Sequence, residues 1–262
     1  MSVLEAKGVG ITFGGLRAVN DFNLSLDKGE LVAIIGPNGA GKTTIFNMLS
    51  GIYQPTDGEI LIDGQSILKK SPHEINLMGV ARTFQNIRLF TKLSVLDNVK
   101  VAMKCKATYG FFDAILRTRK CKKEEQMIEE KSLELLSLFS MDNVSHLQAG
   151  NLPYGEQRKL EIVRALATNP KMLFLDEPAA GMNEVEIEEV MEVIANVRSK
   201  FDITVLLIEH HMSMVMKIAE RIKVLDFGET IAEGKPEEIQ TNPYVIEAYL
   251  GKGGAANDET KG

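Results

Sequence analysis

Short apolar segments separated by turn residues fill the first quarter of the chain. The segments at residues 3–9, 19–26, 31–35 and 59–62 are rich in Val, Ile and Leu, and Gly, Asp and Pro lie between them. This pattern is typical of short β-strands. Because strands so close together usually pair as hairpins, the sequence predicts an antiparallel sheet beside the glycine-rich segment that follows residue 35.

The middle of the chain has helical periodicity instead. Between Leu93 and Leu166, apolar residues recur at intervals of three and four, as they do on the buried face of an amphipathic helix. Predicted strands lie on both sides of this stretch. We therefore expect an α/β core formed by residues 1–90 and 166–250, with a helical subdomain inserted at residues 91–165.

Strands and helices alternate again in the last third of the chain. Buried strands are predicted at residues 172–175 and 204–208, and a helix is predicted to begin at Asn183. An amphipathic helix is predicted near residues 236–250. The tail at residues 251–262 combines glycine, alanine and mixed charges, and we expect it to be disordered.

Composition narrows the class of protein. The 262 residues are 44% hydrophobic and 25% charged, with a net charge of −6, which describes a globular protein without a general attraction for nucleic acid. Glu5 and Lys7 occupy positions that would be apolar in a secretory signal, and no apolar run is long enough to span a bilayer. We therefore expect a cytoplasmic protein. Cys105 and Cys121 have the spacing of neither a metal site nor a disulfide framework.

The strongest motif follows residue 35. Residues 36–44 read GPNGAGKTT and match the phosphate-binding pattern G-x-x-x-x-G-K-S/T, with an apolar strand before it and a helical segment after it. In that context backbone N–H groups surround the phosphates, Lys42 reaches the β- and γ-phosphates, and the Thr43 hydroxyl ligates Mg²⁺. A plain turn between a strand and a helix would require none of these residue types. The predicted nucleotide site comprises Gly36, Pro37, Asn38, Gly39, Ala40, Gly41, Lys42, Thr43 and Thr44.

Acidic residues and histidines follow two of the predicted buried strands. Asp176 comes directly after residues 172–175, where P-loop proteins contact Mg²⁺ through water, and Glu177 is placed to deprotonate a water that attacks the γ-phosphate. The alternative is that both carboxylates only solvate the end of a strand. His210 and His211 follow the next strand, and because neighbouring residues on a strand point to opposite faces, at most one of them contacts the γ-phosphate.

Three further features have two interpretations each. Phe13, beside two glycines, either stacks on adenine or is an ordinary surface aromatic. Pro153 and Gly155 precede a helix whose free N–H groups form either a second anion site or a plain helix cap. The basic run from Arg117 to Lys123 is either a solvated helix face or a contact with anionic lipid headgroups.

Taken in order, these motifs resemble those of the nucleotide-binding subunits of ABC transporters, and the resemblance extends over nearly the whole chain. Gln85 matches the Q-loop, residues 152–157 the signature motif, residues 172–177 Walker B, and His210 the switch histidine. The resemblance implies a single ABC ATPase domain at residues 1–250, with an α/β P-loop NTPase core, an antiparallel β subdomain and an inserted helical subdomain.

The resemblance also implies roles for the residues around the nucleotide. Glu177 would be the catalytic base, and Phe13 would stack on adenine. The residues implied in catalysis are Glu177, His210, Lys42 and Gln85. With ATP as the substrate, the Mg²⁺ ligands would be Thr43, Gln85 and, through water, Asp176.

A head-to-tail dimer is implied as well. Each ATP would lie between the phosphate loop of one ATPase subunit and the signature motif of a second, identical or related subunit. Transmembrane permease subunits would be direct partners at the cytoplasmic face of the cell membrane, and a solute-binding protein would be an indirect one. The signature residues that would contact ATP are Pro153, Tyr154, Gly155 and Glu156.

Two departures from the family pattern narrow the resemblance. In the signature, Pro153, Tyr154 and Glu156 replace the usual serine, glycine and glutamine, so the hydroxyl that normally meets the γ-phosphate is missing. In the D-loop, Asn183 replaces the usual aspartate. Both changes resemble the LivG-type ATPases of high-affinity branched-chain amino-acid importers, while similar ATPases serve urea, amides or other amino acids.

Three other classes fit less well. A P-loop GTPase would carry an N-K-x-D motif, which the sequence lacks. The ABC ATPases of DNA repair carry long coiled-coil or zinc insertions, whereas the segment at residues 91–165 is short and lacks the zinc-binding cysteines. A scaffold that does not hydrolyse ATP would be compatible with the altered signature, but Glu177 and His210 are retained.

Overall fold

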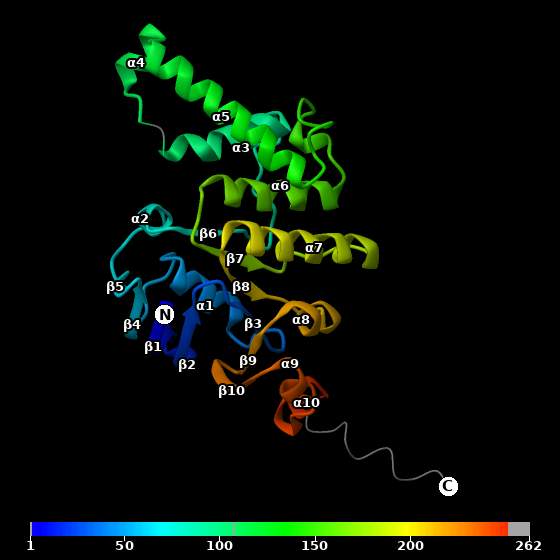
Figure 1. Ribbon diagram of the computed structural model, residues 1–262. Coiled ribbons are helices and arrows are strands. Elements are labelled where there is room, and N and C mark those ends of the chain that lie inside the picture. Colours follow the sequence, from blue (N-terminus) through cyan, green and yellow to red (C-terminus); the bar gives the residue numbers. More distant parts are fainter. Residues whose placement is uncertain (1, 107, 251–262) are drawn as a thin grey trace.

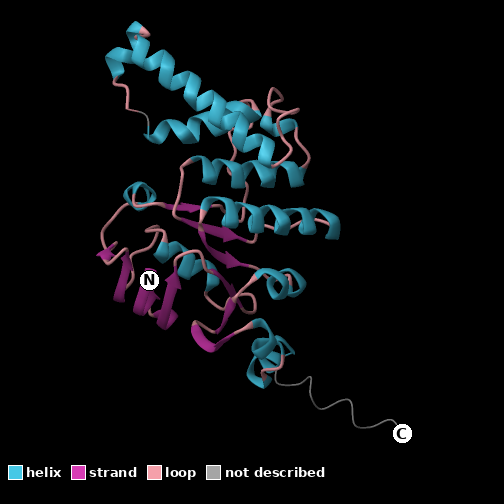
Figure 2. Ribbon diagram, viewed as in Figure 1, coloured by secondary structure: helices cyan, strands magenta, loops and turns pink. Residues whose placement is uncertain are grey.

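The computed structural model describes residues 2–106 and 108–250, and the tail predicted at residues 251–262 lies outside them. Within the described part of the chain, two sheets lie below a lobe made only of helices (Figure 1). Figure 2, coloured by secondary structure, shows the same separation between the strands and the helical lobe.

Four strands form the antiparallel sheet predicted near the N-terminus. β1 and β2 form a hairpin in which Phe13 pairs with Leu16 at the turn. β4 pairs with the other edge of β1. The spatial order is β2-β1-β4-β5, with bounds β1 (Ser2–Phe13), β2 (Leu16–Asp27), β4 (Asp57–Ile62) and β5 (Gln65–Ser66).

The segment at residues 31–35 does not join those hairpins, which corrects the expectation from its close spacing. It forms β3 (Leu31–Ile35), a strand in the middle of a second sheet. All five residues of β3 are buried, as is typical of a parallel strand covered on both faces. The second sheet has the order β10-β9-β3-β8-β7-β6, with bounds β6 (Val80–Arg82), β7 (Met172–Asp176), β8 (Thr204–Ile208), β9 (Arg221–Asp226) and β10 (Glu229–Gly234).

Two hydrophobic cores meet at β3. Val32 and Ile34 face a core shared with α1 (Lys42–Leu49) and the antiparallel sheet. Leu31, Ala33 and Ile35 face a second core beneath the helices on the opposite side. Because alternate residues of a strand point to opposite faces, this single strand connects both cores and holds the loop that follows it in place.

The helical lobe lies between β6 and β7 in sequence. Ser94 and Thr118 cap the first turns of α3 and α5, each accepting a hydrogen bond from a backbone N–H of the helix that follows. A last helix of this stretch, α6, returns the chain to β7. The helices are α3 (Val95–Met103), the 3-10 helix η1 (Lys104–Lys106), α4 (Phe111–Leu116), α5 (Arg119–Leu138), the 3-10 helix η2 (Ala149–Asn151) and α6 (Tyr154–Ala167).

The helix predicted near residues 236–250 is two short helices, α9 (Pro236–Gln240) and α10 (Pro243–Leu250). The prediction was wrong on this point because a proline has no N–H and disfavours helical geometry at the residue before it. Asn242 accepts a hydrogen bond from the Tyr244 N–H at 2.9 Å and starts the second helix. The remaining helices are α2 (Pro72–Leu77), α7 (Glu184–Phe201) and α8 (Met212–Ile218).

Among residues 2–106 and 108–250, no helix combines the length and the apolar character that crossing a membrane requires.

Candidate nucleotide site

The predicted phosphate loop lies between the end of β3 and the start of α1. Gly36 and Gly41 have φ angles of 151° and 99°, and a Cβ at Gly36 would lie 2.1 Å from the carbonyl oxygen of Leu225. Only glycine fits such a position. α1 begins at Lys42, so the N–H groups of its first turn, which lack helical partners, are available to an anion.

Lys42 is a buried cation whose hydrogen-bond partners are uncharged. Its Nζ donates hydrogen bonds to the carbonyl oxygens of Gly36 at 2.6 Å and Pro37 at 2.9 Å. Burial lowers the pKa of the Lys42 ammonium, while the carboxylates of Glu177 and Asp176 raise it. A phosphate group bound here would supply negative charge that the carbonyl groups do not.

A cavity of about 440 Å³ opens over this loop. It brings together Lys42, Thr43, Gln85 and Glu177, which the sequence predicted as one site although they come from segments far apart in the chain. The remaining lining residues are Leu16, Arg17, Ala18, Asn38, Gly39, Ala40, Gly41, Thr44 and Phe227.

Asp176 is buried at the end of β7, beside the cavity. Its Oδ2 accepts a hydrogen bond from Arg82 Nη2 at 2.8 Å, in a salt bridge shielded from solvent. Its Oδ1 is also buried but has no hydrogen-bond partner among the described residues. A buried carboxylate oxygen without a partner suits a water ligand of Mg²⁺, so Asp176, with Thr43 and Gln85 in the cavity lining, fits this ion.

Glu177 has two polar side chains near its carboxylate. Its φ of +49° is rare for a residue other than glycine, and its backbone N–H donates to the Ile208 carbonyl at 2.9 Å. Its Oε2 accepts a hydrogen bond of 2.9 Å from Gln85 Nε2. His210 Nδ1 lies 4.0 Å from the same oxygen. The predicted base, Q-loop residue and switch histidine therefore meet at one carboxylate oxygen.

Glu209 is a buried residue whose role the sequence did not reveal. One carboxylate oxygen accepts a hydrogen bond from the Ala179 N–H at 2.9 Å. The other accepts from the N–H groups of His210 at 2.8 Å and His211 at 3.1 Å, and lies 3.0 Å from the His211 Nδ1. A single carboxylate thus fixes both the segment after Glu177 and the segment that carries His210, the predicted switch histidine.

The predicted signature residues do not line the cavity. Pro153 is the N-cap of α6 and makes no side-chain capping bond, and the next three residues form the first helical turn. Tyr154 lies against Gly181, which precedes Asn183 in the predicted D-loop. A Cβ added at Gly181 would lie 3.1 Å from the Tyr154 ring. Within one chain, the phosphate loop and the signature motif are therefore separate.

Arg158 connects the signature helix to the Q-loop. It is almost fully buried, and its guanidinium donates to the carbonyl groups of Phe84, at 2.6 Å, and Gln85. The same group donates to Glu161 Oε2 at 3.0 Å and to the Tyr154 hydroxyl at 3.2 Å. A shift of α6 would therefore be transmitted to the backbone of Gln85.

Asn183, a predicted departure from the family pattern, is the N-cap of α7. Its Oδ1 accepts hydrogen bonds from the N–H groups of Val185 at 3.0 Å and Glu186 at 3.1 Å. The Glu186 carboxylate accepts in return from the Asn183 N–H at 2.9 Å. Asn and Asp cap helices about equally well, so this change preserves the start of α7.

Two aromatic residues lie near the cavity. The Phe13 ring is 42% exposed and contacts Tyr53 edge to face, with ring centroids 5.3 Å apart. Its hairpin partner Leu16 lines the cavity, whereas Phe13 itself does not. Phe227, 88% exposed, does line the cavity, and the sequence analysis did not single it out.

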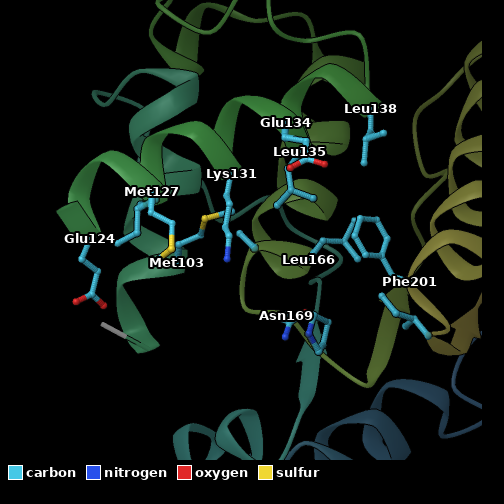
Figure 3. A pocket seen from close by; sticks show the side chains of 14 residues that line it. Met103, Glu124, Met127, Lys131, Glu134, Leu135, Leu138, Leu166, Asn169 and Phe201 are labelled. Carbon is cyan, nitrogen blue, oxygen red and sulfur yellow. The ribbon is translucent and has the colours of Figure 1, made fainter. Parts of the chain in front are cut away.

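A separate cavity of about 450 Å³ lies in the helical lobe (Figure 3). Its lining comes mainly from α5 and from the ends of α3, α6 and α7, and contains none of the predicted site residues. It is lined largely by apolar side chains, which include Met103, Met127, Leu135, Leu138, Leu166 and Phe201.

The strand, phosphate loop and helix, followed by carboxylates after β7 and a histidine after β8, define a P-loop nucleotide-binding protein of the cassette class. Residues 19–180 match the family model described as ABC transporter, and residues 229–255 match one described as branched-chain amino acid ATP-binding cassette transporter. The chain belongs to the ABC transporter family of ATP-binding proteins.

Two curated relatives are similar over almost their whole length. The high-affinity branched-chain amino acid transport ATP-binding protein BraF of Pseudomonas aeruginosa is 44% identical over 250 residues, which cover 95% of this chain and 98% of BraF. The corresponding protein LivG of Escherichia coli K12 has the same identity and the same coverage.

Solved structures confirm the predicted fold class. The ADP conformation of MJ1267, an ATP-binding cassette of an ABC transporter, superposes with a TM-score of 0.83 at 30% identity and covers 96% of this chain and 100% of that one. A dimeric post-hydrolysis state of the cassette MJ0796, bound to ADP and Pi, has a TM-score of 0.75 at 25% identity and covers 89% of this chain and 98% of that one. The chain therefore has the ABC ATPase fold.

Proposed function

We propose that this chain is the ATP-hydrolysing subunit that powers a membrane importer for branched-chain amino acids. The observation that carries the proposal is the 44% identity to BraF and LivG over 95% of the chain. The convergence of Lys42, Gln85 and Glu177 on one cavity supports the ATPase activity that membership of the family implies. The cargo would be recognised by other subunits.

Mg²⁺ would be held beside the phosphate loop. Thr43 and Gln85 would be direct ligands, and Asp176 would act through water at its unpartnered Oδ1. When bound, the ion neutralises charge on the β- and γ-phosphates as the transition state develops. Arg82 would hold the Asp176 carboxylate in place through their salt bridge.

Glu177 would act as the general base toward a water in line with the γ-phosphate. Gln85 and His210, both near Glu177 Oε2, would orient the carboxylate and that water. Lys42 would exchange its hydrogen bonds with loop carbonyl groups for bonds to phosphate oxygens. All four residues would then contact reacting or transferred groups.

A head-to-tail dimer would complete the site. The separation of the phosphate loop from the residues at 153–156 within one chain supports a composite site, because the signature motif has no access to its own cavity. The cassette MJ0796 is dimeric in a post-hydrolysis state bound to ADP and Pi, which supports a dimer for this chain too. The second subunit would be either another copy of this chain or a related ATPase.

Permease subunits would bind near the Q-loop, at the cytoplasmic face of the membrane. A cleft of about 260 Å³ lies there, between β6 of the six-stranded sheet and the helical lobe, and its lining includes Phe84, Arg88, Cys105 and Arg164. Since Arg158 joins α6 to the Gln85 backbone, movement of the lobe would reach this cleft. A solute-binding protein would act on the outer side of the permease.

Reconstitution with the permease tests the proposal. The chain, purified with its co-expressed permease subunits and placed in proteoliposomes, should release phosphate from MgATP and take up leucine, isoleucine or valine when the solute-binding protein is present. Phosphate release together with uptake of urea or amides, and of no branched-chain amino acid, would contradict the assigned cargo. An absence of phosphate release would contradict the ATPase assignment.

A further inference from the structure

The end of the helical lobe carries exposed apolar side chains. Phe111, Phe112, Ile115 and Leu116 of α4 are 75%, 77%, 61% and 74% exposed, and no residue of α4 is buried. We call these four residues the apolar tip. In Figure 1, α4 lies at the end of the lobe that is farthest from both sheets. Apolar side chains gathered in this way on a protein surface mark an interaction site.

Positive charge follows the apolar tip directly. Five cations occur within seven residues, although the net charge of the chain is −6, and all five are exposed. In the part of the chain that the structure describes, none of them forms an ion pair with a carboxylate. We call Arg117, Arg119, Lys120, Lys122 and Lys123 the basic cluster.

Hydrogen bonds at both ends of α4 fix the helix that carries the apolar tip. The Asp113 carboxylate accepts from the Thr118 hydroxyl at 2.9 Å and from the Gly110 N–H at 3.2 Å, and so joins the two ends of α4. The Thr118 bond is the main cause that lowers the pKa of Asp113. Thr108 precedes α4 and Glu124 follows it, and the Glu124 carboxylate accepts a hydrogen bond from the Thr108 N–H at 2.8 Å. The tip is therefore presented to its surroundings and not folded back on the lobe.

We propose that the apolar tip and the basic cluster bind the surface of a lipid bilayer that contains anionic phospholipid. Aromatic and aliphatic side chains enter the interfacial region of a bilayer, and adjacent lysines and arginines bind its phosphate groups. Charge complementarity selects this occupant, because the five exposed cations have no carboxylate partner among the described residues, and Lys120 donates only to the Thr108 carbonyl, at 2.9 Å. A protruding helix also suits a fluid surface, which needs no preformed groove.

The position of the apolar tip agrees with this assignment. η1 leads into α4, and its Cys105 lines the cleft assigned above to the permease. A chain docked on a permease through that cleft would hold its apolar tip close to the membrane. This placement rests on the proposed function, but binding of the isolated chain to vesicles does not, so the two can fail separately.

Vesicle flotation with the purified full chain tests the proposal. The chain should float with vesicles of equal parts phosphatidylcholine and phosphatidylglycerol, less so at high salt, and not with phosphatidylcholine alone. Phe111→Ser with Phe112→Ser should lower the partition coefficient at least about tenfold. Lys122→Gln with Lys123→Gln should lower it about fivefold for each charge, which corresponds to about 1 kcal/mol each.

Two control variants make the same kinds of substitution outside the apolar tip and the basic cluster. Leu77→Ser removes an exposed apolar side chain from α2, and Lys28→Gln with Lys217→Gln makes the same change in net charge away from the lobe. Both should bind vesicles as the original chain does. All variants should keep the thermal midpoint and the ATP affinity of the original chain, because every altered side chain is exposed.

Three results would overturn the proposal. The first is a failure of the original chain to float with phosphatidylglycerol vesicles, and the second is equal flotation of the chain and its tip variants. The third is a difference between the chain and its tip variants that is seen only when the vesicles contain permease, because the partner would then be the permease protein. Loss of ATP hydrolysis with vesicle binding intact would count against the proposed function alone.

Discussion

Glu177 is the residue whose substitution should affect ATP hydrolysis most. It has a left-handed backbone conformation, and its Oε2 lies within reach of both Gln85 and His210. Strain of this kind costs about 1 to 3 kcal/mol and persists where the surroundings impose it. The neighbouring Asp176 has a different setting, because a buried arginine neutralises it. The two adjacent carboxylates are therefore suited to different tasks, one to the base and one to the metal.

Glu177→Gln should keep ATP binding and lose nearly all hydrolysis. Lys42 and the proposed Mg²⁺ ligands remain, whereas a glutamine cannot take a proton, and general-base catalysis contributes about 10²- to 10⁴-fold. Phosphate release and ATP affinity would be measured on the variant and on a control, Glu188→Gln, which alters an exposed carboxylate. Turnover within a factor of two of the original chain would refute the assignment.

Phe13→Ala should weaken ATP binding by about two- to tenfold, because ring stacking contributes roughly 0.5 to 1.5 kcal/mol. Phe13→Tyr should bind as the original does, since it retains the ring face. Phe227→Ala is the informative comparison, because Phe227 lines the cavity and Phe13 lies at its margin. Titration with a fluorescent ATP analogue measures the affinity of each variant. A loss of affinity in Phe227→Ala but not in Phe13→Ala would contradict the role of Phe13.

Glu209→Gln should slow turnover at least about tenfold, with little change in ATP affinity. The Glu209 carboxylate accepts bonds from backbone N–H groups on both of its oxygens, and an amide has only one oxygen, so at least one buried N–H group loses its acceptor. Such a loss costs about 1 to 3 kcal/mol. The thermal midpoint should fall as well. Unchanged turnover would show that Glu209 does not position His210.

The site residues that could be predicted are those that belong to a local sequence motif. Residues 36–44 and Glu177 follow from the local motif, because backbone geometry and spacing define a phosphate loop. Arg82 and Glu209 could not be assigned in that way. Their partners, Asp176 and Ala179, are distant in sequence and become neighbours only when β6, β7 and β8 align in the sheet.

At the scale of elements, α6 joins the signature motif to the Q-loop. Its N-terminus carries Pro153, and one turn later Arg158 holds the carbonyl groups of Phe84 and Gln85. Proline has no N–H and no side-chain donor, so position 153 itself has no hydrogen bond to give to a phosphate. The backbone N–H groups that follow and the helix dipole remain available.

Pro153→Ser should therefore change turnover only modestly. One added hydrogen bond contributes about 0.5 to 1.5 kcal/mol net. A serine N-cap should also stabilise α6, which has no side-chain cap at present, by about 0.5 to 2 kcal/mol. Steady-state phosphate release and thermal unfolding would be measured side by side. A tenfold or greater change in turnover would mean that the altered signature limits catalysis.

The order and type of most elements could be predicted from apolar periodicity. The pairing partners of the strands and the interruption of the last helix could not. β3 was expected among hairpins because of its spacing, yet its all-apolar sequence suits the parallel part of the six-stranded sheet, where it pairs with β8 and β9. The last helix divides at Pro243, where local geometry overrides an amphipathic pattern. The domain bounds at residues 90 and 166 and the tail at 251–262 stay predictions.

At the scale of the whole molecule, the central feature is an incomplete site. The phosphate loop and Glu177 line a cavity to which residues 153–156 of the same chain do not contribute. Gly155 is buried within its own chain, and a Cβ there would lie 2.7 Å from Glu186 Oε1. Gly155→Asp therefore places a second carboxylate beside Glu186 at the start of α6, and its fold is verified by thermal unfolding before use. That charge would repel the phosphate of an ATP bound to a second subunit.

Mixing two inactive variants tests the composite site most directly. Lys42→Ala lacks a working phosphate loop, and Gly155→Asp lacks a working signature, so each alone should not hydrolyse ATP. In a mixed dimer, the intact Lys42 of one chain meets the intact Gly155 of the other, and phosphate release should return at about one working site per pair. If the mixture stays inactive although both chains are folded and mixed dimers are present, the composite site and the mechanism built on it are contradicted.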